Sequence, residues 1–561
     1  MDRFDLGALT REISTASPKA QYWFNYGLNW CFGFNHEEGV KCFQKALEYD
    51  PECVMAHWGV AYGSGPFYNL PWRHFSAAEA NESTKLCFDH IKKAKSLGHK
   101  ATELENTLVE ALGFRFQKPH AVEPDEYDHW DDAYSDAMRR VHKRYPDDHE
   151  IMALFIEAMI TRTPWKLWDV KKGVPAQGAD TLEAMEVCER SIALADQEGK
   201  QIHPTIAHLH IHTMEMSNEP ERAMRSADVL GTLCPDAGHM NHMPGHIYVL
   251  CGEYEKAKAA SEKAIRADDI YVDYAGSFNF YTTAVCHDLH LMMYACMYLG
   301  QYQPAIAAAE KMCNTLSKDV LSVKGRPQLA MTMEGYYSMK MHVLVRFGRW
   351  QDIIDTAMPD DPDLYCVSTA MHYYAKAIAH AFQKDFEAAD QEHDKFYASL
   401  KRIPESRKFF NNNALSTLGV AKKMLEGEIA YHKGNYEVAF EYLRESVRRD
   451  DNLEYTEPWA WMHPPRHALA ALLMEQGHYT EAEQVYRIDL GLDDTLQRCA
   501  HHPNNVWALH GLVECLQKRG EIVELPLFES KLSLAMKKTD VAITSSCLCR
   551  TKVANPACCS A

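Results

Sequence analysis

Residues 23–51 read WFNYGLNWCFGFNHEEGVKCFQKALEYDP, and this stretch decides the fold. Its aromatic and small residues recur at the three- and four-residue spacing that places side chains on one face of a helix. The positions that carry the pattern are Trp23, Tyr26, Gly27, Trp30, Gly39, Phe43, Ala46 and Pro51. The pattern predicts two helices that touch at their small residues, with aromatic rings filling the space between them.

A second pattern, a glycine two residues before an aromatic residue, recurs from residue 252 onward. The five turns are Gly252-Glu253-Tyr254, Gly300-Gln301-Tyr302, Gly348-Arg349-Trp350, Gly434-Asn435-Tyr436 and Gly477-His478-Tyr479. Three residues after each aromatic residue comes Ala257, Ala305, Ile353, Ala439 or Ala482. Strand-like alternation of apolar and polar residues is almost absent. We therefore expect an all-α protein of irregular helix pairs.

Both patterns resemble the tetratricopeptide repeat (TPR), a pair of helices that recurs about every 34 residues. The resemblance implies an α-solenoid whose first helices line a concave surface. We predict an N-terminal extension over 1–20, the solenoid over 21–540 and a flexible tail over 541–561, where the pattern fades. Residues 33–512 also resemble a group of His-rich, TPR-like proteins of no established activity, through segments such as HLHIHTMEMSNEPERA and AGHMNHMPGHIY.

Composition excludes several classes of protein. Apolar residues make up 46% and charged residues 24% of the 561, which is typical of a folded globular chain. The net charge of −19 disfavours nucleic acid and anionic membranes as partners. We expect no transmembrane segment and no secretory signal. The 17 cysteines follow no disulfide framework, so we expect reduced thiols and a cytoplasmic location.

The placement of the histidines is the strongest functional signal. Two i, i+4 pairs lie 34 residues apart, one TPR period: His208 with His212, and His242 with His246. His287 and His290 follow on a third helix. Residues at these spacings share one helix face, so their imidazoles should converge on the concave side of the solenoid. His239 is either a further ligand or a helix cap, and His210 lies off the shared face.

A His-lined cavity of this kind predicts a divalent transition metal, with His208, His212, His242, His246, His287 and His290 as ligands. Nearby methionines favour copper, while zinc and iron remain alternatives. A groove without metal is the competing interpretation. Glu215 shares the histidine face and is the predicted catalytic base of a hydrolytic site.

Four further residues are predicted to contact a substrate. Trp165 and Trp459 follow prolines in loops and offer apolar pocket walls. The guanidinium of Arg466 can bind a substrate carboxylate through two hydrogen bonds. His467 occupies the same repeat position as His208 and His242. Packing between repeats and ordinary ion pairs explain these residues equally well.

Two functional hypotheses follow. The chain is a metal-dependent enzyme, an oxidoreductase or hydrolase that acts on a small molecule in the His-rich cavity, or a metal-free scaffold that binds a peptide or protein partner in its groove. Nucleotide-binding, kinase and serine-hydrolase motifs are absent. Near the C-terminus, Cys547-x-Cys549 does not form a tetrahedral metal motif, and Cys558-Cys559-Ser560-Ala561 departs from a prenylation box because its middle positions are not aliphatic.

Overall fold

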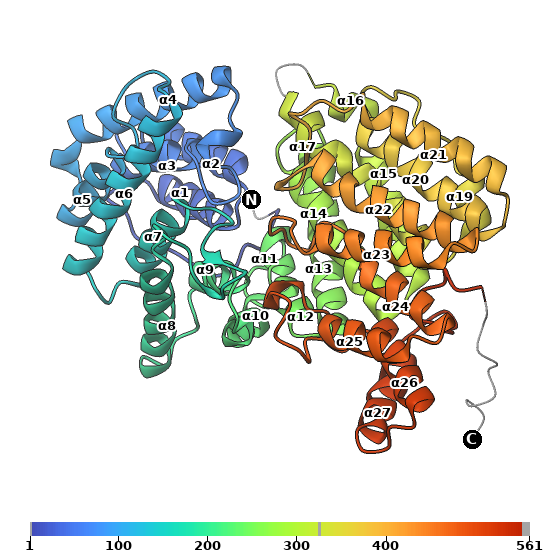
Figure 1. Cartoon of the computed structure of the whole chain (residues 1–561). Helices are drawn as coiled ribbons and strands as arrows, with labels where there is room; N and C mark the ends of the chain where they lie inside the picture. The colour runs from blue at the N-terminus through green and yellow to red at the C-terminus, as the bar shows by residue number, and fades with distance from the viewer. Residues whose placement is uncertain (1–2, 324–326, 552–561) are drawn as a thin grey trace. The chain divides into compact units, whose positions relative to one another are not determined.

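A computed structural model describes residues 3–323 and 327–551 of the chain (Figure 1). Helices dominate the described residues, and the predicted all-α fold is confirmed. Strands there are limited to two small antiparallel ladders, β1(Trp168–Asp169) with β2(Val174–Pro175) and β3(Lys408–Phe409) with β4(Asn412–Asn413). No helix among the described residues is long and apolar enough to cross a membrane.

The chain divides into two compact units. The division falls inside the stretch that was predicted to form one solenoid. The first unit contains residues 1–247 and 263–276, and the second contains 248–262 and 277–561. Helices of the first unit are α1(Pro18–Phe32), α2(His36–Tyr49), α3(Val54–Ser64), α4(Ala77–Ser96), α5(Glu103–Leu112), α6(Pro124–Arg144), α7(His149–Ile160), α8(Thr181–Gln197), α9(Pro204–Met214), α10(Met224–Leu230) and α11(Gly238–His242). Two unit boundaries fall within α12(Pro244–Leu250) and α13(Tyr254–Ala275), and the third follows the end of α13.

Helices of the second unit are α14(Thr282–Leu299), α15(Tyr302–Thr315), α16(Lys318–Leu321), α17(Pro327–Tyr337), α18(Met339–Arg346), α19(Trp350–Asp355), α20(Cys366–Phe382), α21(Phe386–Leu400), α22(Ala414–His432), α23(Tyr436–Asp450), α24(Pro465–Glu475), α25(Tyr479–Asp489), α26(Val506–Arg519) and α27(Leu525–Met536). Consecutive helices pack against each other in both units, as in α1 with α2, α14 with α15 and α22 with α23.

The five glycine turns explain how the second unit forms its helix pairs. Each turn glycine has a positive φ, between 59° and 86°, which a residue with a Cβ adopts only with strain. The aromatic residue two positions later begins the next helix in every case: α13, α15, α19, α23 and α25. The small or aliphatic residue that follows is completely buried each time. The pattern of glycine, aromatic residue and small or aliphatic residue therefore ends one helix and packs the next helix against it.

A buried ion cluster holds part of the first unit together. The guanidinium of Arg115 is 1% exposed, and its Nε lies 3.1 Å from Oδ1 of Asp131. Its Nη1 lies 3.3 Å from Oε2 of Glu157. Because such charges are costly to bury alone, the three groups depend on one another.

Described residues of the N-terminal extension and of the predicted flexible tail are buried. Phe4 is 5% exposed, and its ring packs 5.2 Å from that of Trp30 in the first unit. In the second unit, Ile543 and Ser546 of the predicted tail are buried. These segments are held because they cover apolar and polar groups of the helices. Residues 552–561, the rest of the predicted tail, lie outside the described residues.

Candidate metal centre

Two helices of the first unit, α9 and α11, supply the histidines of the candidate site. Helix α9 begins at Pro204, a residue that suits the first turn because that position makes no helical N–H bond. Every residue from Thr205 to Met214 is buried, so α9 has no side that faces solvent. The nitrogen atoms of its histidines must therefore find partners inside the protein.

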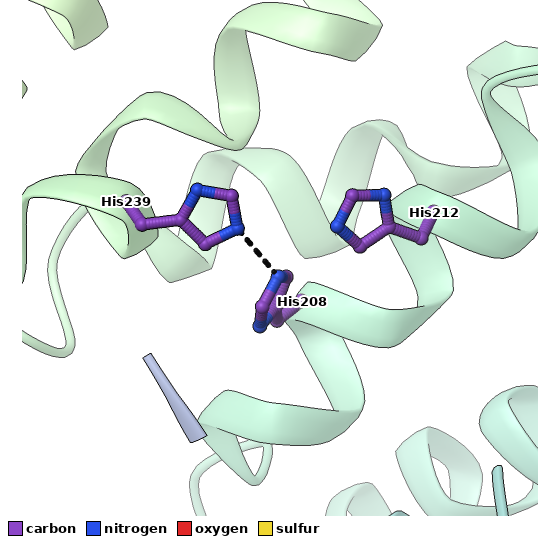
Figure 2. Close-up of side chains that lie close together, drawn as sticks. All are labelled: His208, His212 and His239. Carbon is purple, nitrogen blue, oxygen red and sulfur yellow. Dashed lines mark hydrogen bonds between the residues drawn. The ribbon is translucent and has the colours of Figure 1, made fainter. Parts of the chain in front are cut away.

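His208, His212 and His239 form a compact cluster (Figure 2). One ring nitrogen from each lies within 4.8 Å of one from each of the other two. Nε2 of His208 and Nε2 of His239 are 3.1 Å apart. His208 and His212 are completely buried, and His239 is 3% exposed. The structure thus joins two of the six predicted ligands to a third histidine from another helix.

The partners of Nδ1 in His208 and His212 bear on which ring nitrogen carries the proton. Nδ1 of His208 is 3.0 Å from the carbonyl oxygen of Phe32, which can only accept, so Nε2 carries the lone pair. Nδ1 of His212 lies 2.9 Å from Oε1 of Glu215, and an ionised carboxylate imposes the same tautomer. Burial lowers the pKa of His208 to about 3, so this ring is neutral at pH 7.

Glu215 links this cluster to the second predicted pair. It follows α9 as its C-cap residue and is completely buried. Its Oε2 lies 2.5 Å from Nδ1 of His246, whose Nε2 lies 2.7 Å from Nε2 of His242. Burial raises the pKa of Glu215 well above its usual range and lowers that of His246 to about 3. With one oxygen on His212 and the other on His246, Glu215 is placed to orient imidazoles.

Phe34 is a part of the site that sequence reasoning missed. Its ring centroid lies 4.3 Å from that of His208, and the ring stacks on His212 and His239 at 5.7 and 5.1 Å. Its φ of 59° is unusual for a bulky residue and costs strain. The Gly33-Phe34-Asn35 segment between two predicted helices was the only sequence signal, and it does not reveal which ring faces the histidines.

Trp165, a predicted pocket wall, lies near the site but behind another ring. Its backbone N–H donates to the hydroxyl of Tyr68 over 3.1 Å, and the two rings are 5.4 Å apart. The Tyr68 ring in turn lies 4.5 Å from the ring of His212. Tyr68 therefore stands between Trp165 and the imidazole cluster.

The remaining predicted ligands lie on α14, in the second unit. His290 is buried there, with its ring 5.4 Å from Tyr336 and 4.7 Å from Phe410, while His287 is partly buried. Their inclusion in the metal site stays a prediction. His210 lies off the cluster as expected, with Nδ1 2.9 Å from the hydroxyl of Ser226.

The other predicted substrate contacts belong to the second unit, and each has a partner there. The indole N–H of Trp459 donates to Asp450 over 2.9 Å. Arg466 pairs with both oxygens of Asp451, at 2.5 and 2.6 Å. Nε2 of His467 lies 2.8 Å from Oδ2 of Asp489. A substrate role for these three residues stays a prediction.

The helix pairs, their glycine turns and the inward-facing histidines define an α-helical repeat protein. A tetratricopeptide repeat model matches residues 239–271. The crystal structure of yeast Tom70 is similar at 12% identity over 92% of this chain and 84% of that chain, with a TM-score of 0.31.

A human IFIT1 dimer with PPP-AAAA is similar at 9% identity over 91% of this chain and 88% of that chain, also with a TM-score of 0.31. Similarity at this level carries no argument about function. No curated protein matches the sequence at a significant level.

Proposed function

We propose that this protein binds a divalent transition metal through Nε2 of His208, His212 and His239. Imidazole nitrogens suit copper, zinc and iron. Copper remains the first choice because Met214 and Met240 lie on the same two helices, as soft donors close in sequence. Three protein ligands leave coordination positions for a small molecule, which is typical of catalytic rather than structural metal sites.

The observation that carries the proposal is the pair of oxygen partners at Nδ1 of two rings. Nδ1 of His208 faces a backbone carbonyl and Nδ1 of His212 faces the carboxyl group of Glu215. With that carboxyl group ionised, as a bound cation favours, both rings direct the lone pair of Nε2 into the cluster. Proteins orient metal-binding histidines in this way.

Glu215 has a positioning role in this proposal, in place of the predicted general base. Its carboxylate holds Nδ1 of both His212 and His246. A completely buried carboxylate is unfavourable when ionised, and its raised pKa reflects that cost. A metal cation on the neighbouring imidazoles would favour the ionised form, so metal and carboxylate stabilise each other.

When bound, the metal would supply Lewis-acid or redox chemistry, as an oxidoreductase or hydrolase requires. The protein itself would contribute an environment of aromatic side chains from which bulk water is excluded. Phe34 and Tyr68 cover faces of the imidazoles, and burial of the rings limits access of bulk water. A small molecule fits such a site better than a chain segment does.

The alternative is a metal-free scaffold that binds a peptide, a role common among TPR proteins and consistent with the match over 239–271. Peptide-binding repeats present their contact residues at an open concave surface. His208 and His212 are completely buried, so they are poorly placed to contact a peptide.

Elemental analysis of the purified protein, before and after reconstitution with copper, zinc or iron salts, tests the proposal. We expect about one equivalent of metal, lost in the variant His208→Ala/His239→Ala. His210→Ala is the matched control, because His210 is equally buried on the same helix but bonds Ser226. Absence of bound metal after reconstitution, or its loss from the His210→Ala control, would contradict the proposal.

A further inference from the structure

The C-terminal described segment is fastened to the second unit by polar contacts. The hydroxyl of Ser546 donates to the carbonyl oxygen of His467 over 3.3 Å and also bonds Tyr486. Arg550 forms an ion pair of 2.7 Å with Glu514. Because anchors lie on both sides of it, the short stretch between residues 546 and 550 is held in one conformation.

That stretch contains two cysteines, and the backbone of one contacts the sulfur of the other. The backbone N–H of Cys549 donates to Sγ of Cys547 over 3.4 Å. Cys547 is partly exposed, whereas Cys549 is 1% exposed. An N–H that donates to a sulfur stabilises the thiolate form of that sulfur. Cys547, the more exposed of the two cysteines, is therefore the one whose ionisation is favoured.

A buried guanidinium lies beside the pair. Arg346 of α18 is 5% exposed, and its Nη2 donates to the carbonyl oxygen of Ser546 over 2.5 Å. Among the described residues, Arg346 forms no ion pair with a carboxylate, although burial lowers its pKa. Since a guanidinium stays charged, its field falls on the thiol of the next residue, Cys547.

The two thiols are consequently unequal. The pKa of Cys547 is lowered by its hydrogen bond with Cys549 and by the charge of Arg346. The pKa of Cys549 is raised by burial and by its interaction with Cys547. Cys313 offers a comparison, because it is also partly exposed but burial raises its pKa to about 11.

We propose that Cys547 and Cys549 form a redox-active dithiol that a hydroperoxide oxidises to an intramolecular disulfide. The thiolate of Cys547 attacks the terminal oxygen of the hydroperoxide and breaks the O–O bond. The leaving oxygen takes up a proton and departs as an alcohol, or as water when the oxidant is hydrogen peroxide. Cys547 becomes a sulfenic acid.

The second step closes the disulfide. The sulfur of Cys549 loses its proton and displaces hydroxide from the sulfur of Cys547, and the two combine as water. In total, two thiols give two electrons and two protons to one hydroperoxide. A reducing thiol reverses the modification by thiol–disulfide exchange.

A metal site on the same two sulfurs is the competing hypothesis. Paired thiolates bind soft cations, but here the guanidinium of Arg346 repels a second positive charge. Arg346 and the unequal ionisation of the pair therefore favour oxidation over metal binding.

Full-length protein, reduced and freed of reductant, is treated with hydrogen peroxide and digested with trypsin without reduction. One tryptic peptide, residues 539–550, carries both cysteines and no other. We expect this peptide to lose two hydrogens and to regain them with dithiothreitol. In Cys549→Ser, dimedone should trap a sulfenic acid on Cys547, and Cys547→Ser should give no adduct on Cys549.

A second measurement compares reactivity. At pH 7 we expect iodoacetamide to label Cys547 at least about tenfold faster than Cys313, because labelling follows the thiolate fraction. The proposal would be overturned if peptide 539–550 stays reduced under peroxide, or if iodoacetamide labels Cys547 and Cys313 at equal rates. Protection of both sulfurs from iodoacetamide by stoichiometric zinc or copper(I) would instead identify a metal site and also overturn it.

Discussion

Replacement of Glu215 by Gln tests how the metal centre is built. The carboxylate accepts hydrogen bonds from Nδ1 of His212 and Nδ1 of His246, at 2.9 and 2.5 Å. Glutamine has nearly the same shape, but only one of its two polar atoms accepts. Its NH₂ group must donate to one of the two rings, which forces the proton of that ring onto Nε2.

If that ring is His212, its Nε2 cannot bind the metal. If it is His246, His212 keeps its tautomer but loses the negative charge that makes its Nε2 a better ligand. Loss of an orienting partner of this kind costs about 10- to 100-fold in metal affinity. At about 1.4 kcal/mol for each factor of ten, Glu215→Gln should weaken binding by about 1.4–2.8 kcal/mol. The decrease reports loss of the charged orienting partner, because the volume of the side chain hardly changes.

Competition with a chromophoric chelator measures the dissociation constant, and circular dichroism confirms that the helices persist. Glu334→Gln is the matched control, since Glu334 is also completely buried but accepts from the backbone N–H groups of Val367 and Ser368. Metal affinity within about twofold of wild type in Glu215→Gln would refute the reasoning. An equal loss in the Glu334→Gln control would show a general effect of neutralising a buried carboxylate.

Three further outcomes are expected. His208→Ala/His212→Ala should abolish metal binding while the helical circular dichroism signal persists, with His210→Ala retaining the metal; occupancy unchanged in the double variant would contradict the assignment of these two rings as ligands. Arg115→Met leaves two buried carboxylates without their cation and should lower the free energy of unfolding by about 3–5 kcal/mol in urea titrations, so a loss below about 1 kcal/mol would argue against a coupled ion cluster. Removal of residues from Val541 onward should lower the melting temperature, because buried hydrogen bonds worth about 1–3 kcal/mol each lose a partner; an unchanged melting temperature would show that this segment is dispensable, as a loose tail is.

Local sequence patterns were sufficient for the helix pairs. A glycine with a positive φ, an aromatic residue that begins the next helix and a small residue that allows close contact all act within a few residues. Such patterns specify the same structure wherever they occur, so the all-α repeat fold could be predicted without tertiary information. The pairing of His208 with His212 followed from helical spacing in the same way.

The composition of the candidate metal centre depended on long-range contacts. The carbonyl oxygen that sets the tautomer of His208 belongs to Phe32, 176 residues away, and Glu215 reaches His246 across 31 residues. Phe34 joins the histidines because the segment between α1 and α2 lies against His208 of α9.

The sequence by itself determined which helices form and which histidines share a helix face, because both follow from the 3.6-residue period of the helix. Only the tertiary structure decided that His239 completes the cluster, that Glu215 orients imidazoles, and that Cys547 lies beside Arg346. Those relations depend on how separate helices and loops pack, and no spacing along the chain encodes the distance between two packed elements.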